Sequence, residues 1–197
     1  MKTFSPCLTL GFISCCLLCS SCNVLEPVKD KSVNHLLDPT VPERSLTATA
    51  PVIAIAKPAL PSYLDRQQVV TRTGAGQLGV SDYHLWAEPL DAAIARVTAV
   101  NLSRLTRSLN ILPAKDFVTM DYTSIIEIRI SKFEADGDGR MILECTWKVQ
   151  PVRGQDVTPR SFRTSIGISQ PDKDLSGRTA AMNEALAQLA REISKQL

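Results

Sequence analysis

The most regular pattern in the chain is an alternation of apolar and polar side chains within residues 126–130, 141–149 and 162–168. A period of two is typical of strands with one buried face, so these segments predict three strands. The sequence Asp-Gly-Asp-Gly at 136–139 predicts a tight hairpin between the first two strands, because glycine supplies the positive φ such a turn needs. In the second strand Cys145 falls on the apolar side, so we expect a buried and unreactive thiol.

Two other segments repeat their apolar residues every three or four positions, as an amphipathic helix does. The first runs from Pro89, which the first turn of a helix tolerates, to about Leu109. The second follows Ser176, a residue type that commonly caps a helix N-terminus. The apolar stripe of the first helix is Leu90, Ile94, Val97 and Val100, and that of the second is Met182, Leu186, Leu189, Ile193 and Leu197.

The region before the first helix predicts shorter strands. One lies near residues 32–38, and a brief β-branched run at 52–55, bounded by prolines, predicts an edge strand. Residues 69–73 and 78–86 predict two strands around a glycine turn. One-sided strands and one-sided helices must cover each other, so we expect the α+β class. The expected architecture is a single two-layer domain over 51–197, including the strand near 32–38, with a mixed or antiparallel sheet covered by two amphipathic helices.

The charge excludes some partners. The chain has 197 residues with 22 basic and 20 acidic side chains, a formal net charge of +2. This gives no electrostatic argument for nucleic acid, or for an anionic membrane surface, as the main partner. Aromatic residues make up 5% of the chain, which argues against a base-stacking surface.

Five of the six cysteines lie within the first 22 residues, so the body cannot form an internal disulfide. Lys2 and the uncharged apolar run at 8–18 are typical of a secretory signal, too short to span a bilayer. The segment ends in Leu-Cys-Ser-Ser before Cys22 and resembles a bacterial lipobox, although a cysteine stands where leucine is usual. We therefore expect a lipoprotein signal peptide over 1–21, acylation of Cys22, and a tether over 22–50. The alternatives are acylation at Cys16, or a plain secretory signal that leaves Cys22 as a free thiol.

Several motifs could carry chemistry, but their surroundings argue against it. Residues 74–79 match G-x-G-x-x-G, yet a strand pattern follows where a dinucleotide site needs a helix. Residues 136–147 start like a calcium loop but lack its later acidic ligands. His35 and His84 lie in separate predicted strands and, with one buried cysteine, make no usual zinc site. We expect no metal, no cofactor and no enzymatic activity, with a surface hydrolase as a remote alternative.

Two strings of residues resemble those of a known family. They are Tyr-Leu-Asp-Arg with Gln-Val-Val-Thr-Arg at 63–72, and Trp-Ala-Glu-Pro-Leu at 86–90. They resemble the PqiC family, the ABC-type transport auxiliary lipoproteins that accompany MCE-domain lipid transport systems. The order of elements is also similar over residues 32–197, and His35 is a minor departure. The resemblance implies a lipoprotein that docks on an MCE-domain periplasmic protein and its transporter complex.

The resemblance also implies a cellular location and a partner-binding surface. Asn23, rather than aspartate, follows the cysteine, which resembles the sorting pattern of an outer-membrane lipoprotein on the periplasmic face. Tyr63, Arg66 and Arg72 are the candidate partner-binding residues, on a segment that we expect at a sheet edge; Asp65 and Arg66 also allow a structural role. The alternative is an envelope assembly or structural lipoprotein that binds a β-barrel or the cell wall. A homo-oligomer is left open.

Overall fold

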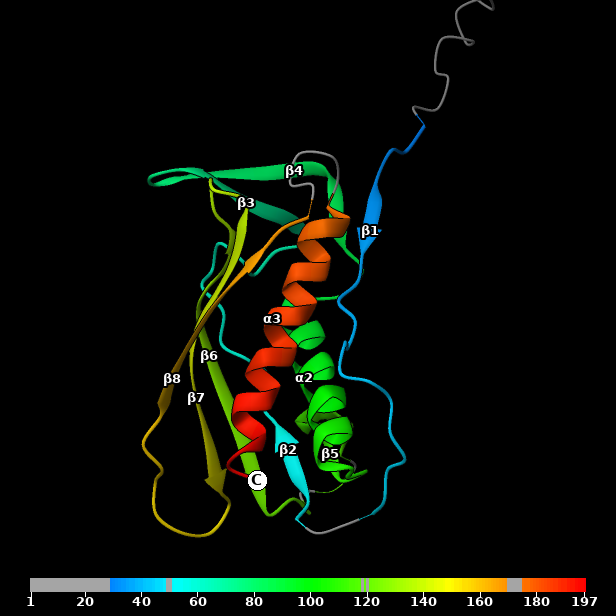
Figure 1. Cartoon of the computed structure of the whole chain (residues 1–197), viewed down its shortest axis with the longest axis vertical. Helices are drawn as coiled ribbons and strands as arrows, with labels where there is room; N and C mark the ends of the chain where they lie inside the picture. Colours follow the sequence, from blue (N-terminus) through cyan, green and yellow to red (C-terminus); the bar gives the residue numbers. More distant parts are fainter. Residues whose placement is uncertain (1–28, 49–50, 118, 120, 170–174) are drawn as a thin grey trace, which may run out of the picture. The chain divides into compact units, whose positions relative to one another are not determined.

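The computed structural model describes residues 29–48, 51–117, 119, 121–169 and 175–197. Residues 32–197 pack as one compact unit (Figure 1). In chain order its elements are β1 (Val33–His35), β2 (Ile53–Ile55), β3 (Gln68–Gly74), β4 (Gln77–Trp86), α2 (Leu90–Thr106), β5 (Ile111–Pro113), a 3-10 turn η2 (Ala114–Asp116), β6 (Ser124–Ala135), β7 (Arg140–Pro151), β8 (Arg160–Gly167) and α3 (Ser176–Ser194).

The larger sheet has five strands in the order β5-β2-β6-β7-β8. The pairs β5–β2 and β2–β6 are parallel, while β6, β7 and β8 form an antiparallel meander. Helices α2 and α3 pack against each other and cover one face of this sheet (Figure 1). The core between the layers includes Ile126, Leu143, Ile94 and Leu186, which are almost completely buried. The α+β class, the mixed sheet and the two covering helices are therefore confirmed.

The remaining strands form a second sheet of three strands in the order β1-β4-β3, where the sequence suggested one sheet. Strands β3 and β4 are the predicted hairpin, with Gly76 at a φ of 70° in its turn. Strand β1 pairs with β4 in parallel, so that Val33 lies opposite His84. A period of two indicates which face of a strand is buried but not which strand lies beside it.

Strand β2 is an interior strand, not the predicted edge strand. It pairs with β5 on one side and β6 on the other, and all three of its residues are buried. Pro51 and Pro58 lie outside the paired residues, so every backbone group that pairing needs is present. The edge strand on this side of the sheet is β5. The sequence did not predict it, because three residues are too few to show a period of two.

Part of the predicted tether belongs to the packed unit. Leu37, in the segment 32–38 that was expected to join the domain, is buried at 0% exposure, and Val41, in the predicted tether beyond it, is buried at 2%. The amide N–H of Val41 donates to Oδ1 of Asn101 at 3.2 Å, and Arg96 and Arg104 of α2 donate to the carbonyl oxygens of Leu37 and Val41. These contacts fix the segment along α2, so the packed unit begins at Ser32.

The helix ends differ slightly from their predicted positions. Helix α2 ends at Thr106, and Arg107 adopts a left-handed conformation with a φ of 58°. In α3 the N-cap position is held by Leu175, not by Ser176, which is the first residue of the helix. Leu197 lies beyond the end of α3 and is 39% exposed, so the buried stripe ends at Ile193.

Cys145 lies in β7 with its side chain in the core, as the alternation predicted. Burial raises the pKa of its thiol to about 12. Only the thiolate is a nucleophile. Near neutral pH an alkylating reagent should therefore react with Cys145 about a thousandfold more slowly in the folded protein than in the unfolded protein. Mass spectrometry of the Cys145 peptide after timed alkylation, with and without denaturant, measures this ratio. Equal rates would contradict the inward register of β7.

Candidate docking surface

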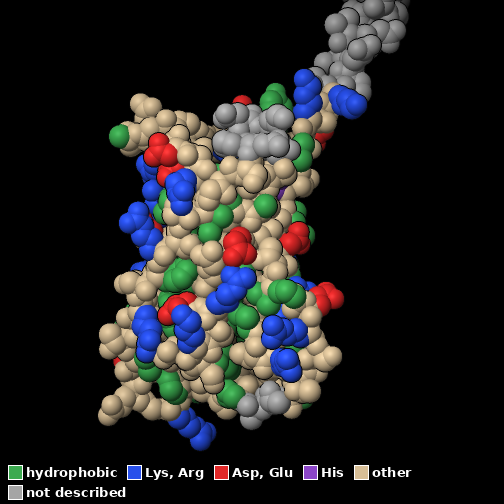
Figure 2. All heavy atoms as spheres, in the orientation of Figure 1, with side chains coloured by type: hydrophobic (Ala, Val, Ile, Leu, Met, Phe, Trp, Pro, Cys, Tyr) green, Lys and Arg blue, Asp and Glu red, His purple; other side chains and the backbone are tan. Residues whose placement is uncertain are grey.

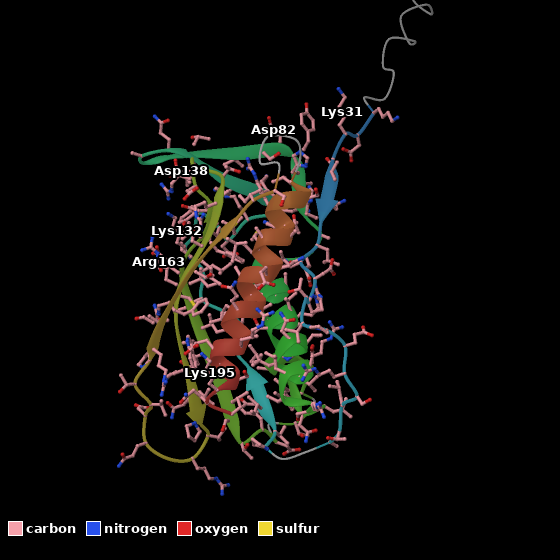
Figure 3. The ribbon with its side chains drawn as sticks, in the orientation of Figure 1. Lys31, Asp82, Lys132, Asp138, Arg163 and Lys195 are labelled. Carbon is pink, nitrogen blue, oxygen red and sulfur yellow. The ribbon has the colours of Figure 1, made fainter. Side chains whose placement is uncertain are left out.

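The helices leave the second face of the β6–β7–β8 meander uncovered. We call this the outer face, and its polar residues include Glu127, Arg129, Lys132, Glu144, Thr146, Lys148 and Arg163. Lys132, Glu144 and Arg163 lie in one row across the strands. Figure 3 shows Lys132 and Arg163 pointing away from the helices. The alternation that buries the isoleucines of β6 therefore also presents a charged surface.

The outer face carries more positive than negative charge. Its cations are Arg129, Lys132, Arg140, Lys148 and Arg163, and its carboxylates are Glu127, Glu134 and Glu144, for a net charge of +2. The Arg163 Nε lies 3.1 Å from Glu144 Oε1, and the Lys148 Nζ lies 3.5 Å from Glu127 Oε2. Among the described residues neither Arg129 nor Lys132 is ion-paired. Surface pairs of this kind contribute only about 0–1 kcal/mol each, so they leave these side chains available to a partner.

The outer face has a hollow beside strand β6. It lies where residues 56–59 continue β2 alongside β6, with the backbone of Ala59 bonded to both Ile128 and Ile130. Its walls include Lys57, Arg129, Lys148 and Pro159. The Nζ of Lys57 also lies 2.7 Å from Asp91 Oδ2, which ties this segment to the first turn of α2.

One end of the outer face, next to the β6–β7 turn, is covered by residues that the sequence analysis singled out. A bulge between Ile130 and Lys132 shifts the alternation by one residue, so that Phe133 faces the core and Glu134 faces outward. The side chain of Glu134 nevertheless has 0% exposure. The Nε of Arg72 in β3 lies 2.5 Å from Glu134 Oε1. Tyr63 also lies against this carboxylate and packs on the core.

The electrostatics of this cluster favour a neutral phenol and a charged guanidinium. Burial raises the pKa of Tyr63 to about 12, and its hydrogen bond with Glu134 adds to the effect. The hydrogen bond with Glu134 raises the pKa of Arg72 above its ordinary value. Arg72 therefore supplies the positive charge that balances the buried carboxylate of Glu134, and it fastens the β3–β4 hairpin to the five-stranded sheet.

The structure brings two of the three predicted partner-binding residues together, on Glu134, and leaves the third apart. Arg66 is exposed in the turn before β3, where its backbone N–H donates to the carbonyl of Leu64 at 2.9 Å. Strand β3 is an edge strand of the smaller sheet, as expected. Tyr63 and Arg72 have structural contacts, so Arg66 is the member of the trio whose side chain is free to be altered without disturbing the Glu134 cluster.

Sequence reasoning missed Glu134 itself. The available signal was an acid between the apolar residues Phe133 and Ala135 at the end of a strand. Its burial depends on the bulge at residue 131 and on the hairpin that covers it, and neither feature has a pattern in the sequence.

The two histidines meet because β1 pairs with β4. The Nε2 of His35 lies 3.0 Å from Nδ1 of His84, and the ring centroids are 5.1 Å apart. Within the described residues no group of three or more His, Cys, Asp or Glu side chains is placed to hold a metal ion. This pair joins the first strand of the unit to the hairpin.

The predicted acylation site, Cys22, lies outside the described residues. Among the residues that are described, no helix has the length and apolar character needed to cross a bilayer.

Comparison with known proteins places this fold in a family. The family model described as "ABC-type transport auxiliary lipoprotein component" matches residues 35–194. A crystal structure of an uncharacterized protein is similar at 21% identity and a TM-score of 0.64, covering 78% of this chain and 95% of that one. A Xanthomonas campestris protein of the DUF330 family is similar at 19% identity and a TM-score of 0.65, covering 82% and 92%. At these identities the two structures show a shared fold. A search of the curated proteins found no match.

Proposed function

Because the chain belongs to the family of ABC-type transport auxiliary lipoproteins, we propose that it is a membrane-anchored periplasmic accessory lipoprotein of an MCE/ABC-type intermembrane lipid transport system. It acts by tethering and docking. The observation that carries this proposal is the family match, which spans nearly the whole packed unit. The family is one of auxiliary components and not of enzymes. The resemblance of residues 63–72 and 86–90 to PqiC proteins supports an MCE-domain partner.

Tethering is the part played by the N-terminal segment. Acyl chains on Cys22 would each contribute about 0.8 kcal/mol per buried CH₂, so two or three chains hold a protein on a membrane almost permanently. Asn23 supports the outer membrane as the destination. Because the packed unit begins at Ser32, only residues 23–31 remain as the tether, with a random-coil span of about 15–18 Å. The body is therefore held close to the membrane.

Docking is the part we assign to the outer face, with Tyr63 and Arg72 at its covered end, and to the exposed side chain of Arg66. A sheet held by two helices is a rigid platform, and its net positive charge suits an acidic surface on the partner. We expect that reversing two charges, Arg129→Glu with Lys132→Glu, weakens co-purification with the MCE-domain protein by about tenfold or more, because like charges then face each other across the interface. The thermal midpoint should hardly change, since neither side chain is ion-paired among the described residues.

The experiment needs two further variants. Arg66→Glu tests the exposed member of the predicted trio and should also reduce partner recovery. Arg153→Glu, an exposed residue in the loop after β7, is the matched control and should leave recovery unchanged. A folded Arg129→Glu/Lys132→Glu protein that retains full partner binding would remove the outer face from the docking surface. Recovery of a β-barrel in place of an MCE-domain protein would favour an envelope assembly role.

A further inference from the structure

The tip of the β3–β4 hairpin is apolar and carries no charge. Residues 73–81 include no acidic or basic side chain. Within and just beyond them, Leu78, Val80 and Tyr83 are 38%, 44% and 54% exposed. Figure 1 shows the hairpin lying across the end of the body at which β1 starts. The same small sheet also exposes Val33 in β1, with Leu36 just after it.

The uncharged tip is unusual for a strand edge. Among the described strands β3 pairs with β4 alone, so its other edge presents backbone groups that no described strand pairs. Natural proteins normally protect such an edge with charged residues or proline, because it can pair with other chains. In the sequence, the charged residues nearest the tip are Arg72 and Asp82. Arg72 is paired with Glu134. Exposed apolar side chains gathered on an uncharged edge are typical of a surface that contacts a partner or a membrane.

The short segment between Cys22 and Val33 limits how far the small sheet can lie from the membrane. Ten residues, 23–32, separate Cys22 from Val33. Fully extended they reach about 36 Å at most, and as a random coil they span about 16–19 Å. Since Val33 lies opposite His84 in the register, the small sheet is the part of the body that the anchor holds nearest the membrane. The twelve residues of β6 extend the body by about 40 Å in the other direction.

We propose that the uncharged hairpin tip, residues 73–81, with Tyr83 beside it, is a second membrane contact that rests in the interfacial layer of the bilayer and orients the anchored domain. This inference rests on the proposed acyl anchor at Cys22. Tyrosine is enriched at membrane interfaces, where its ring meets acyl chains and its hydroxyl meets water. Asp82 and Asp138 lie at the same end of the body (Figure 3). Their charges oppose a strongly anionic surface, so the contact is apolar and suits a bilayer rich in phosphatidylethanolamine.

A fluorescent probe at Val80 tests the contact. Val80→Cys is made in the full chain, the acylated protein is purified, and the new thiol is labelled with an environment-sensitive dye; Cys145 is buried and stays unlabelled. The protein is reconstituted into vesicles of phosphatidylethanolamine with a minor fraction of phosphatidylglycerol, with or without bromine on the acyl chains. We expect a blue shift and at least about twofold quenching by the brominated lipid, as for a side chain within about 5–10 Å of the headgroup boundary.

The matched control is Val157→Cys, which is 38% exposed in the loop joining β7 and β8 at the opposite end of the body (Figure 1). Its probe should show no quenching. Adding Leu78→Asp to the Val80→Cys protein should reduce the quenching, since a carboxylate resists the interfacial layer.

The mass of the N-terminal peptide separates the two ways to fail. An acylated chain whose Val80 probe stays unquenched overturns the hairpin contact and leaves the anchor intact. A chain without acyl groups overturns both the anchor and the inference. A blue shift without bromine quenching shows that protein, such as a second copy of the chain, covers the hairpin, and it also overturns the membrane contact.

Discussion

Replacing Arg72 with methionine should destabilise the protein more than removing the whole Arg72–Glu134 pair does. In the single variant the carboxylate of Glu134, whose side chain has 0% exposure, stays buried without its cation. For Glu134 that uncompensated burial should cost about 3–5 kcal/mol of unfolding free energy. In the double variant Arg72→Met/Glu134→Leu both charges are replaced by apolar groups of similar size, a change that is often neutral or stabilising. Chemical denaturation of the three proteins measures the difference.

The result also tests how the hairpin is held. If Arg72→Met and the double variant unfold at the same denaturant concentration, the carboxylate reaches water and Arg72 does not fasten β3 to the sheet. The sequence suggested Arg66 and Arg72 as equivalent surface probes. The ion pair with Glu134 makes them different, because a glutamate at position 72 would face a second buried carboxylate.

Cys22→Ala should leave the precursor at full length and without acyl groups. The modifying enzyme needs a thiol to form the thioether, and alanine offers none. Feeding cells an alkyne-bearing fatty acid and measuring the intact mass gives both readouts, label and cleavage. Nearly all label should be lost, because position 22 then has no thiol to carry the acyl-bearing group.

The rival cysteine provides the matched control for this experiment. Cys16→Ala should be labelled and processed like the natural chain, with cleavage before residue 22. If Cys16→Ala loses the label and Cys22→Ala keeps it, the anchor lies earlier and the tether is longer. If both keep their label, neither cysteine is the acylated residue. If the natural chain itself carries no label, the lipoprotein assignment is wrong.

Local periodicity was enough to predict the antiparallel meander and both helices. Met141, Leu143, Cys145 and Trp147 are all buried, as their spacing required, because a strand with one covered face cannot slip by one residue without exposing all of them. Residues at helical spacing, such as Leu186 and Leu189, are buried for the same reason. The pattern that predicts each of these elements lies within about a dozen consecutive residues.

The features that escaped prediction all depend on distant parts of the chain. Val41 looked like an isolated apolar residue in a tether, and only the surface of α2, with Asn101 and Arg104, shows why it is buried. Glu134 is balanced by Arg72, which stands sixty-two positions earlier in the sequence. His35 and His84 meet across forty-nine positions. Pairings of this kind have no local period, so a single sequence without its fold does not reveal them.

The interior position of β2 has a consequence for the order in which the protein folds. Ile53 pairs with Ile111 on one side and Ser124 on the other, so β2 is paired on both sides only when both later segments are present. A chain that crosses a membrane N-terminus first releases Ile53–Ile55 well before either partner. The β6–β7–β8 meander, whose contacts are local, can form early, whereas parallel pairing of distant strands is slow because a long loop must close first. We therefore expect β2 to be among the first core strands to emerge and the last to be enclosed, with closure of the five-stranded sheet as the slow step of folding.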